Sequence, residues 1–485
     1  MTFHNLTPAI PGFYSDPTWC VGPDGVYLAH SSFEYFPGAP VFRSTDLVAW
    51  EQVGNVIDRP DQLDLATFAG ASAGIYGSTL RHHDGRFWFV TTNIGEFMRG
   101  QLIFHAEDAA GPWSDPVAVE GTLGIDPDLV WTDDGDCLLT WNHFHGDGRG
   151  QVRIDPLTGA RLSEIRHVWP GTGTMKAPEG PHLYHVGDWW YVLLAEGGTE
   201  KGHSVTIARA SRPDAAPDEW EPHPANPILT HRSTDHPVQS VGHADLIEYE
   251  GRWWACYHGV RPQGRTPSWH LIGRETFICP VEWVDGWPVF REDLAVAHPF
   301  DTALTDDFTA APSPRWVVPQ GDLSHATPGP EGLALDPGRP LVIRVQDLEW
   351  TAEATFDVAS GTGRLLVYLD DDHWYSIEAG DGRVRALGQA GPFTTIFGEA
   401  GLPAGPTVTL RLSAALPEQG PRPADAPDLI SMSVVDGDAV ATLATVDGRY
   451  VSTEVASGFT GRTVGVQALD GAVTVRLFRY WPGQA

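Results

Sequence analysis

The sequence predicts an all-β protein in which a five-bladed β-propeller is followed by a second all-β domain. Three observations lead to this fold class. Neither half of the chain has a sustained helical period of apolar residues, a turn motif recurs five times in the first 300 residues, and the composition changes near residue 300. A length of 485 residues is sufficient for two large domains.

The strands of the first domain are indicated by short apolar runs bounded by Gly, Asp and Pro, such as VYLAHSSF and FWFVTTNI. Five times, an Asp-Gly, Gly-Asp or Glu-Gly turn introduces an aromatic-rich run. The turn glycines are Gly25, Gly85, Gly135, Gly187 and Gly251, at intervals of 60, 50, 52 and 64 residues. A β-sandwich would have the same strand content without this period, whereas each propeller blade is one four-stranded repeat. The repeats therefore predict five blades.

The second domain differs from the first in composition. Residues 1–300 hold 15 of the 19 Trp, 18 of the 20 His and all four Cys. Residues 295–314 are polar, with Pro and Asp at turn-forming positions, as in a linker that runs over the surface. We therefore expect the propeller in residues 1–300 and a separate β-domain in residues 301–485.

The charge balance excludes several classes of partner. The net charge is −32 and Lys occurs only at Lys176 and Lys201, so we expect neither nucleic-acid binding nor any other polyanion partner. The acidic surplus favours a soluble surface and a small neutral ligand. The N-terminus has no signal-peptide pattern and no 18-residue apolar run predicts a membrane span. Together with four widely spaced cysteines, these features predict a cytoplasmic protein without membrane association.

The repeat phase predicts where a functional site lies, because the innermost strand of every blade lines the axial channel. Eight or nine positions before the turn glycines stand Asp16, Tyr76, Asp126, Glu179 and His243. Desolvating a carboxylate without partners costs several kcal/mol, so three carboxyls at one phase require a functional explanation. We interpret them as a glycosidase site, in which one carboxylate activates water and a carboxylic acid protonates the leaving oxygen.

These residues also have plainer interpretations. Asp16 can close a turn before a proline, and Asp128 is an alternative to Asp126 because both point to the same face of a strand. His243 is a hydrogen-bonded core residue, a group that orients Asp126, or the ligand of a cation in the channel. Glu179 stands between two prolines and is poorly explained by turn or strand preferences.

Further residues are candidates for sugar binding. Arg274 is either a surface charge or an inward guanidinium that keeps carboxylates ionised and contacts hydroxyl groups. Phe33, Tyr76 and Phe97 are candidate stacking platforms, although aromatic residues in strands are more often core. This chemistry requires no cofactor. The alternative is that the propeller channel holds a calcium ion with His243 as one of its ligands.

Five segments together resemble glycoside hydrolase family 43: YSDP at 14–17, GIDPDL at 124–129, APEGPHLY at 177–184, HPVQSVGHADL at 236–246 and GRETF at 273–277. Within the family, they are most similar to the two-domain β-xylosidases and α-L-arabinofuranosidases, and the resemblance covers the whole chain. It implies a five-bladed propeller followed by a concanavalin-like β-sandwich. A shorter segment, SGFTGRTVG at 457–465, resembles the loop that places a Phe at the pocket mouth, which implies that Phe459 is a lid residue.

The resemblance also implies roles for the site residues. Asp16 would be the general base, Asp126 the carboxylate that modulates and orients, and Glu179 the general acid of an inverting mechanism. His243 and Arg274 match positions that support the modulator and contact the terminal sugar.

The chain departs from this branch on the second repeat, where Tyr76-Gly77-Ser78 stands in place of the usual Trp-Ala-Pro. The smaller platform leaves the sugar preference open. We expect an exo-acting β-xylosidase on small neutral xylo-oligosaccharides, with α-L-arabinofuranosidase or a bifunctional enzyme as the alternative.

Two interpretations from other classes compete with this one: a non-catalytic carbohydrate-binding propeller and a retaining fructosidase of similar fold. The second domain is either an independent sugar-binding module or a cap that completes the pocket and supports a homo-oligomer, and we favour the cap.

Overall fold

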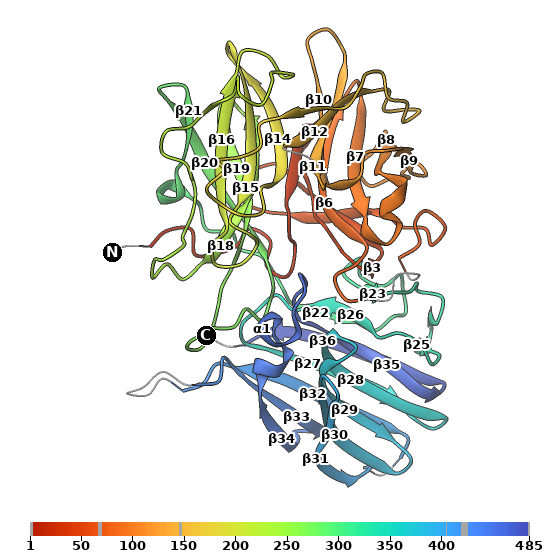
Figure 1. The fold of residues 1–485 in the computed structure, drawn as a ribbon. Helices are drawn as coiled ribbons and strands as arrows, with labels where there is room; N and C mark the ends of the chain where they lie inside the picture. The colour runs from red at the N-terminus through yellow and green to blue at the C-terminus, as the bar shows by residue number, and fades with distance from the viewer. Residues whose placement is uncertain (1–2, 66–69, 145–147, 404, 419–424, 484–485) are drawn as a thin grey trace. The chain divides into compact units, whose positions relative to one another are not determined.

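A computed structural model describes residues 3–65, 70–144, 148–403, 405–418 and 425–483 (Figure 1). Strands dominate these residues, which confirms the all-β class. The chain divides into two compact units. The first unit comprises Met1–Ile10, Tyr14–Val260 and Glu275–Phe300, and the second comprises Pro11–Phe13, Arg261–Arg274 and Asp301–Ala485. Within the described ranges, no helix has the length and apolar character needed to cross a membrane.

The first unit contains five four-stranded antiparallel sheets, which confirms the five predicted blades (Figure 1). Blade 1 is β1 (Thr18–Gly22), β2 (Gly25–Ala29), β4 (Gly38–Ser44) and β5 (Glu51–Ile57), and blade 2 is β6 (Ile75–His83), β7 (Arg86–Asn93), β8 (Gln101–Ala106) and β9 (Val117–Val119). Blade 3 is β10 (Gly124–Trp131), β11 (Cys137–His143), β12 (Arg149–Ile154) and β13 (Arg166–Val168). Blade 4 is β14 (Glu179–Val186), β15 (Trp189–Glu196), β16 (Ser204–Ala210) and β17 (Glu221–Pro222), and blade 5 is β18 (Gln239–Tyr249), β19 (Arg252–Val260), β20 (Glu275–Val284) and β21 (Trp287–Phe290). Each predicted turn glycine lies where the first strand of a blade turns into the second.

The first strands of the blades form a closed ring around the axis. Strand β1 contacts β6 and β18, β10 contacts β6 and β14, and β14 contacts β18. Apolar side chains fill the wedges between neighbouring blades, as where Trp19 and Leu28 of blade 1 pack with Ile247 and Cys256 of blade 5. A single blade could not bury both of its faces, so closure of the ring is what completes the core.

An ionic network, here called the axial network, occupies the centre of the ring. Arg81 of β6 donates from Nη1 to Asp245 of β18 at 2.7 Å and from Nη2 to Asp128 of β10 at 2.8 Å. Asp245 also accepts hydrogen bonds from the hydroxyls of Thr18 at 2.8 Å and Tyr184 at 2.7 Å. Thr18 lies on β1 and Tyr184 on β14, so every first strand contributes to the network.

Charge complementarity keeps the axial network ionised despite its burial. Burial alone would raise the pKa of Asp245, but Arg81 and the surrounding hydrogen bonds lower it to about 2. Because this folded pKa lies below the unfolded value of about 3.9, the stabilisation is complete above about pH 4 and is lost as the pH falls towards 2. The network is therefore intact throughout the neutral range.

The second unit is a β-sandwich of two antiparallel sheets. One sheet has the order β24-β25-β36-β27-β32-β33-β34, with β22 also paired to β36, and the other has the order β26-β35-β28-β29-β30-β31. The strands of the first sheet are β22 (Leu304–Asp306), β24 (Ala326–Gly329), β25 (Gly332–Leu335), β27 (Trp350–Asp357), β32 (Thr407–Ala415), β33 (Leu429–Asp436), β34 (Ala439–Asp447) and β36 (Val473–Pro482). Those of the second are β26 (Leu341–Arg344), β28 (Gly361–Asp370), β29 (His373–Gly380), β30 (Arg383–Ala390), β31 (Phe393–Gly401) and β35 (Thr463–Gly471). Alternate residues of β32 are buried, as expected for a strand with one face on the core.

A segment that interrupts blade 5 belongs to the second unit. Residues 261–274 connect β19 to β20, and they contact the short helices η3 (Gly448–Val451) and α1 (Thr453–Ala456). The backbone N–H of His270 donates to a carboxylate oxygen of Glu454 at 2.9 Å, and its Nδ1 lies 2.6 Å from the other oxygen. The guanidinium of Arg449 stacks on Trp269 at 4.8 Å from the ring centroid. Arg274 is therefore held by residues of the sandwich unit.

We predict that Asp245→Asn lowers the free energy of unfolding by about 3–5 kcal/mol, because it breaks a fully buried carboxylate's ion pair and leaves the partly buried Arg81 with one of its two carboxylates. Denaturant unfolding at pH 7 measures the loss. The matched control is Asp136→Asn, which removes a half-exposed partner of Arg153 and should change stability little. Equal effects of the two substitutions would show that the axial network is not a major source of stability.

Candidate active site

Four of the five first strands carry a β-bulge at the same level. The register with the second strand shifts between Ile75 and Ser78 in β6, Ile125 and Asp128 in β10, Glu179 and His182 in β14, and Gly242 and Asp245 in β18. At each shift two residues oppose one, which bends the strand and re-aims a side chain. The candidate residues were selected because they stand eight or nine positions before a turn glycine. In these four blades, that position coincides with a β-bulge.

Backbone conformations at this level are left-handed. Asp126 has φ 55°, Gly180 has φ 56° and His243 has φ 51°, and Asp16, two residues before β1, also has φ 51°. Non-glycine residues in this region carry backbone strain and are concentrated at functional sites. The same left-handed backbone conformation therefore occurs at Asp16, Asp126 and His243, which lie at the same level of the channel.

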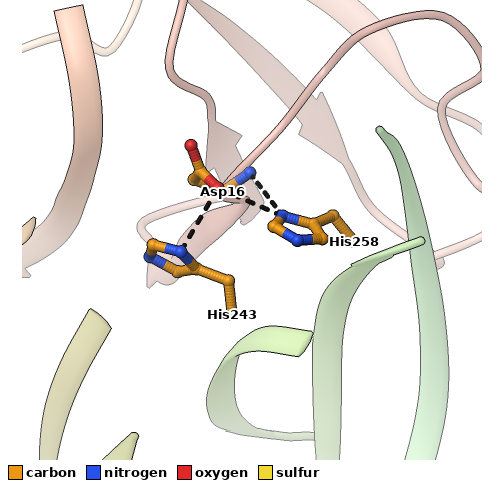
Figure 2. A group of neighbouring side chains, drawn as sticks. All are labelled: Asp16, His243 and His258. Atoms are coloured by element: carbon orange, nitrogen blue, oxygen red, sulfur yellow. Dashed lines mark hydrogen bonds and ion pairs between the residues drawn. The ribbon is translucent and has the colours of Figure 1, made fainter. Parts of the chain in front are cut away.

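Asp16 is the centre of a buried hydrogen-bonded cluster (Figure 2). Its Oδ1 lies 3.2 Å from His243 Nδ1 and 3.1 Å from His258 Nδ1, and its Oδ2 accepts from the hydroxyl of Ser31 at 2.7 Å. The backbone N–H of Asp16 donates to His258 Nδ1 at 3.2 Å. These contacts hold both carboxylate oxygens in fixed directions.

His243 carries a positive charge at neutral pH. Burial alone would lower its pKa, but Asp16 first, and then Asp126 and Glu179, raise it to about 9. A Cβ built on Gly77 would lie 2.5 Å from Asp126 Oδ1 and 3.0 Å from His243 Cε1, so the side chains of Asp126 and His243 are neighbours. His243 forms its ion pair with Asp16, a partner that none of the predicted alternatives named, and it is buried as expected for a hydrogen-bonded core histidine.

The carboxylate of Asp126 is hydrogen-bonded to the backbone next to Glu179. The N–H of Gly180, the residue after Glu179, donates to Asp126 Oδ2 at 3.1 Å. Two glycines let the groups approach: a Cβ at position 77 would lie 2.5 Å from Asp126 Oδ1, and one at position 180 would lie 2.9 Å from His243 Nε2. Gly77 therefore allows the carboxylate of Asp126 to lie directly against blade 2.

The aromatic candidates take different positions. Phe33 is buried, and its ring meets that of the partly exposed Tyr76 edge to face, with centroids 5.8 Å apart. Phe97 lies in the short helix η1 (Ile94–Arg99) and packs near Phe144, with centroids 5.5 Å apart. Tyr76 immediately precedes Gly77, the glycine that lies against the carboxylate of Asp126.

Arg274 and Phe459 lie together in the second unit. The guanidinium carbon of Arg274 is 5.6 Å from the centroid of the Phe459 ring, and its Nη2 donates to the Phe459 carbonyl oxygen at 3.4 Å. Two residues that are 185 positions apart in the sequence thus form one structural element. Arg274 is buried, so it is not the surface charge that was one of the two predicted alternatives.

Several residues of the site were not predicted from the sequence. His258 lies on β19, the second strand of its blade, and a search restricted to first strands does not reach it. Asp128, considered as an alternative to Asp126, lies inside the ring as well, but one level deeper, in the axial network. The signal that could have found it is its spacing: Asp128 and Asp245 each stand two residues after a site residue.

The buried group of Asp16, His243 and His258 could hold a metal ion, since one ligand atom from each lies within 4.8 Å of the others. Calcium prefers six to eight oxygen ligands, whereas this group offers one carboxylate and two imidazoles, a set that suits zinc better. With a pKa of about 9, His243 must also lose a proton before it can bind any cation. The donor set therefore does not favour the calcium ion that was kept as an alternative.

Two family models match the chain. The model described as glycosyl hydrolases family 43 matches residues 6–288, and that described as beta xylosidase C-terminal concanavalin A-like domain matches residues 338–477. The chain belongs to glycoside hydrolase family 43. The second match confirms that the β-sandwich of this family 43 enzyme is concanavalin-like.

Curated relatives of this glycoside hydrolase include both xylosidases and arabinosidases. A non-reducing end alpha-L-arabinofuranosidase of Bacteroides ovatus is 40% identical over 306 residues, covering 62% of this chain and 55% of that protein. A xylosidase/arabinosidase of Butyrivibrio fibrisolvens is 39% identical over 300 residues, covering 58% and 55%. A beta-xylosidase of Bacillus subtilis is 32% identical over 307 residues, covering 58% and 56%. The matches span about half the length of these relatives.

Solved structures of the family match over both units of the chain. A Bacteroides ovatus xyloglucan-locus GH43B has a TM-score of 0.88 at 31% identity and covers 100% of both chains. A xylan beta-1,4-xylosidase from Bacillus halodurans has a TM-score of 0.86 at 25% identity, covering 99% of this chain and 100% of that one. The combination of propeller and sandwich is therefore shared with these proteins.

We predict that removing metal ions with EDTA leaves glycoside hydrolysis unchanged, whereas added Zn²⁺ inhibits it by occupying Asp16. The inhibition should be stronger at pH 8 than at pH 6, because Zn²⁺ must displace the proton of His243. Initial rates with and without each metal at both pH values measure these effects, with Mg²⁺ as the control. Loss of activity in EDTA with recovery on adding Ca²⁺ would instead establish a calcium requirement.

Proposed function

We propose that this enzyme removes terminal pentose residues from small neutral xylo-oligosaccharides in the cytoplasm, as an exo-acting β-xylosidase that inverts the anomeric configuration. The observation that carries the proposal is a set of contacts that link the three carboxyl-bearing segments. Asp16 Oδ1 lies 3.2 Å from His243 Nδ1, and the N–H of Gly180, the residue after Glu179, donates to Asp126 Oδ2 at 3.1 Å. Two carboxyls on opposite sides of one anomeric carbon are what glycoside hydrolysis requires. A carbohydrate-binding propeller without catalysis gains nothing from this arrangement.

In the proposed step, Asp16 acts as the general base. Its carboxylate accepts a proton from a water molecule whose oxygen attacks the anomeric carbon. The contacts from Ser31 and His243 hold the carboxylate ionised and oriented, since hydrogen bonds and a nearby positive charge both favour the charged form. His258 fixes the backbone of the same residue.

Glu179 acts as the general acid in the same step. It gives its proton to the glycosidic oxygen while the bond from that oxygen to the anomeric carbon breaks. The products are a pentose of inverted configuration and the shortened alcohol, and Asp16 and Glu179 exchange their protonation states until solvent resets them. Asp126, hydrogen-bonded to the N–H of Gly180, places a negative charge next to the acid, which favours its protonated form before the reaction.

We predict that Glu179→Ala loses about 10²–10⁴-fold in kcat on xylobiose, the range that a general acid contributes. On a dinitrophenyl glycoside, whose leaving group needs no protonation, the loss should be much smaller. Steady-state kinetics on both substrates provide the measurement, and Glu200→Ala, an exposed residue at a surface ion pair with Lys176, is the control. A Glu179→Ala enzyme that hydrolysed xylobiose normally would remove Glu179 from the role of acid.

The second candidate is α-L-arabinofuranosidase activity, alone or combined with xylosidase activity. It is favoured by the 40% identity to the Bacteroides ovatus arabinofuranosidase, compared with 32% to the Bacillus subtilis beta-xylosidase. Both sugars present similar hydroxyl groups to the same carboxyl cluster.

We expect the value of kcat/KM on an aryl β-xyloside to exceed the values on the corresponding α-L-arabinofuranoside and β-galactoside. A higher value on the arabinofuranoside would select the second candidate. In the same experiment, NMR should detect the α-anomer of xylose as the first product of the β-xyloside. The β-anomer would indicate retention, and with it a mechanism of the fructosidase type.

A further inference from the structure

Arg149 is a buried cation that the proposed mechanism does not use. It begins β12, the third strand of blade 3, and its side chain is 6% exposed. Its Nη1 donates to the carbonyl oxygen of Pro178, the residue immediately before Glu179. Burying a guanidinium is expensive, so its presence here requires compensation from neighbouring charges.

Carboxyl groups on three strands supply this compensation. Burial lowers the pKa of Arg149, while Glu196, Asp126 and Glu179 act in the opposite direction. Glu196, at the end of β15, is fully buried, and its oxygens accept from the backbone N–H of Thr172 at 3.1 and 3.3 Å. Arg149 thus interacts electrostatically with one carboxylate outside the proposed active site and with two inside it.

The backbone on both sides of Glu179 is fixed. Before it, the carbonyl of Pro178 is held by Arg149, and after it, the N–H of Gly180 is held by Asp126 at 3.1 Å. Ala177, with φ 48°, and Gly180, with φ 56°, are both left-handed, so this segment is bent at two points and is not a simple extension of β14. A segment of this shape needs external hydrogen bonds to keep one conformation.

We propose that Arg149 is a positioning residue for the general acid: by holding the Pro178 carbonyl, it aims the carboxyl of Glu179 at the leaving oxygen. This inference rests on the proposed role of Glu179. Arg149 donates to the backbone carbonyl of the residue before Glu179, so its proposed effect is exerted through Glu179. The rigid fork of Arg suits this task better than the single flexible ammonium of Lys.

The test is the dependence of activity on the leaving group. A misplacement of the acid by about 1 Å costs about 10²-fold, so Arg149→Met should lose about 10- to 100-fold in kcat on xylobiose, with KM changed little. On a dinitrophenyl glycoside the loss should be less than about 3-fold, because that leaving group departs without protonation. Arg149→Lys should recover part of the activity on xylobiose. The matched control is Arg153→Met on the same strand, whose side chain is 41% exposed and pairs with Asp136.

Each outcome decides the question. Equal losses on both substrates would show that Arg149 only stabilises the fold, and unchanged activity would show that it does nothing for the acid. If Arg149→Met fails to fold, as judged by its unfolding midpoint, the activities on the two substrates are compared for Arg149→Lys instead. Failure of the proposed function is a separate result, since Glu179→Ala itself would then show no dependence on the leaving group.

Discussion

The charge of Arg81 at the centre of the propeller is the interaction on which the rest of the site depends. Asp128 and Asp245 come from blades 3 and 5, and in a medium of low dielectric they would repel each other without the guanidinium between them. Hydrogen bonds from Thr18 and Tyr184 extend the same contact to blades 1 and 4. The five first strands are thereby fixed in height relative to one another. The bulges one level above are then aligned, and so are the side chains that they carry.

The sequence was sufficient to predict the blades and the level of the site for a physical reason. In these blades, a bulge lies near the start of the first strand and a turn lies at its end. The length of paired strand between the bulge and the turn is nearly constant. Counting back from Gly135 or Gly251 therefore arrives at Asp126 or His243, although the sequence does not reveal that a bulge is there. Asp126 stands nine positions before its turn glycine, and His243 and Glu179 stand eight before theirs; in blade 4 the left-handed residue is Gly180, the one after Glu179.

The remaining site residues could not be found by that count, because they come from other strands. His258 and Arg149 lie on the second and third strands of their blades, where apolar packing dominates the pattern and a single polar residue gives no signal. The axial network was missed for a different reason: Arg81 resembles any other charged residue near a turn until its partners are known. The pairing of Arg274 with Phe459 depends on how a segment of blade 5 folds, which no local pattern indicates.

The segment between β19 and β20 has a consequence for recombination between related genes. A chimera joined at residue 300 would take Trp269 and His270 from the parent that supplies the propeller, and Arg449 and Glu454 from the parent that supplies the sandwich. These four residues are partners within one unit, so the two parents must agree at positions on both sides of the junction. Family members of this architecture should therefore exchange their sandwich domains only when this short segment is exchanged with them.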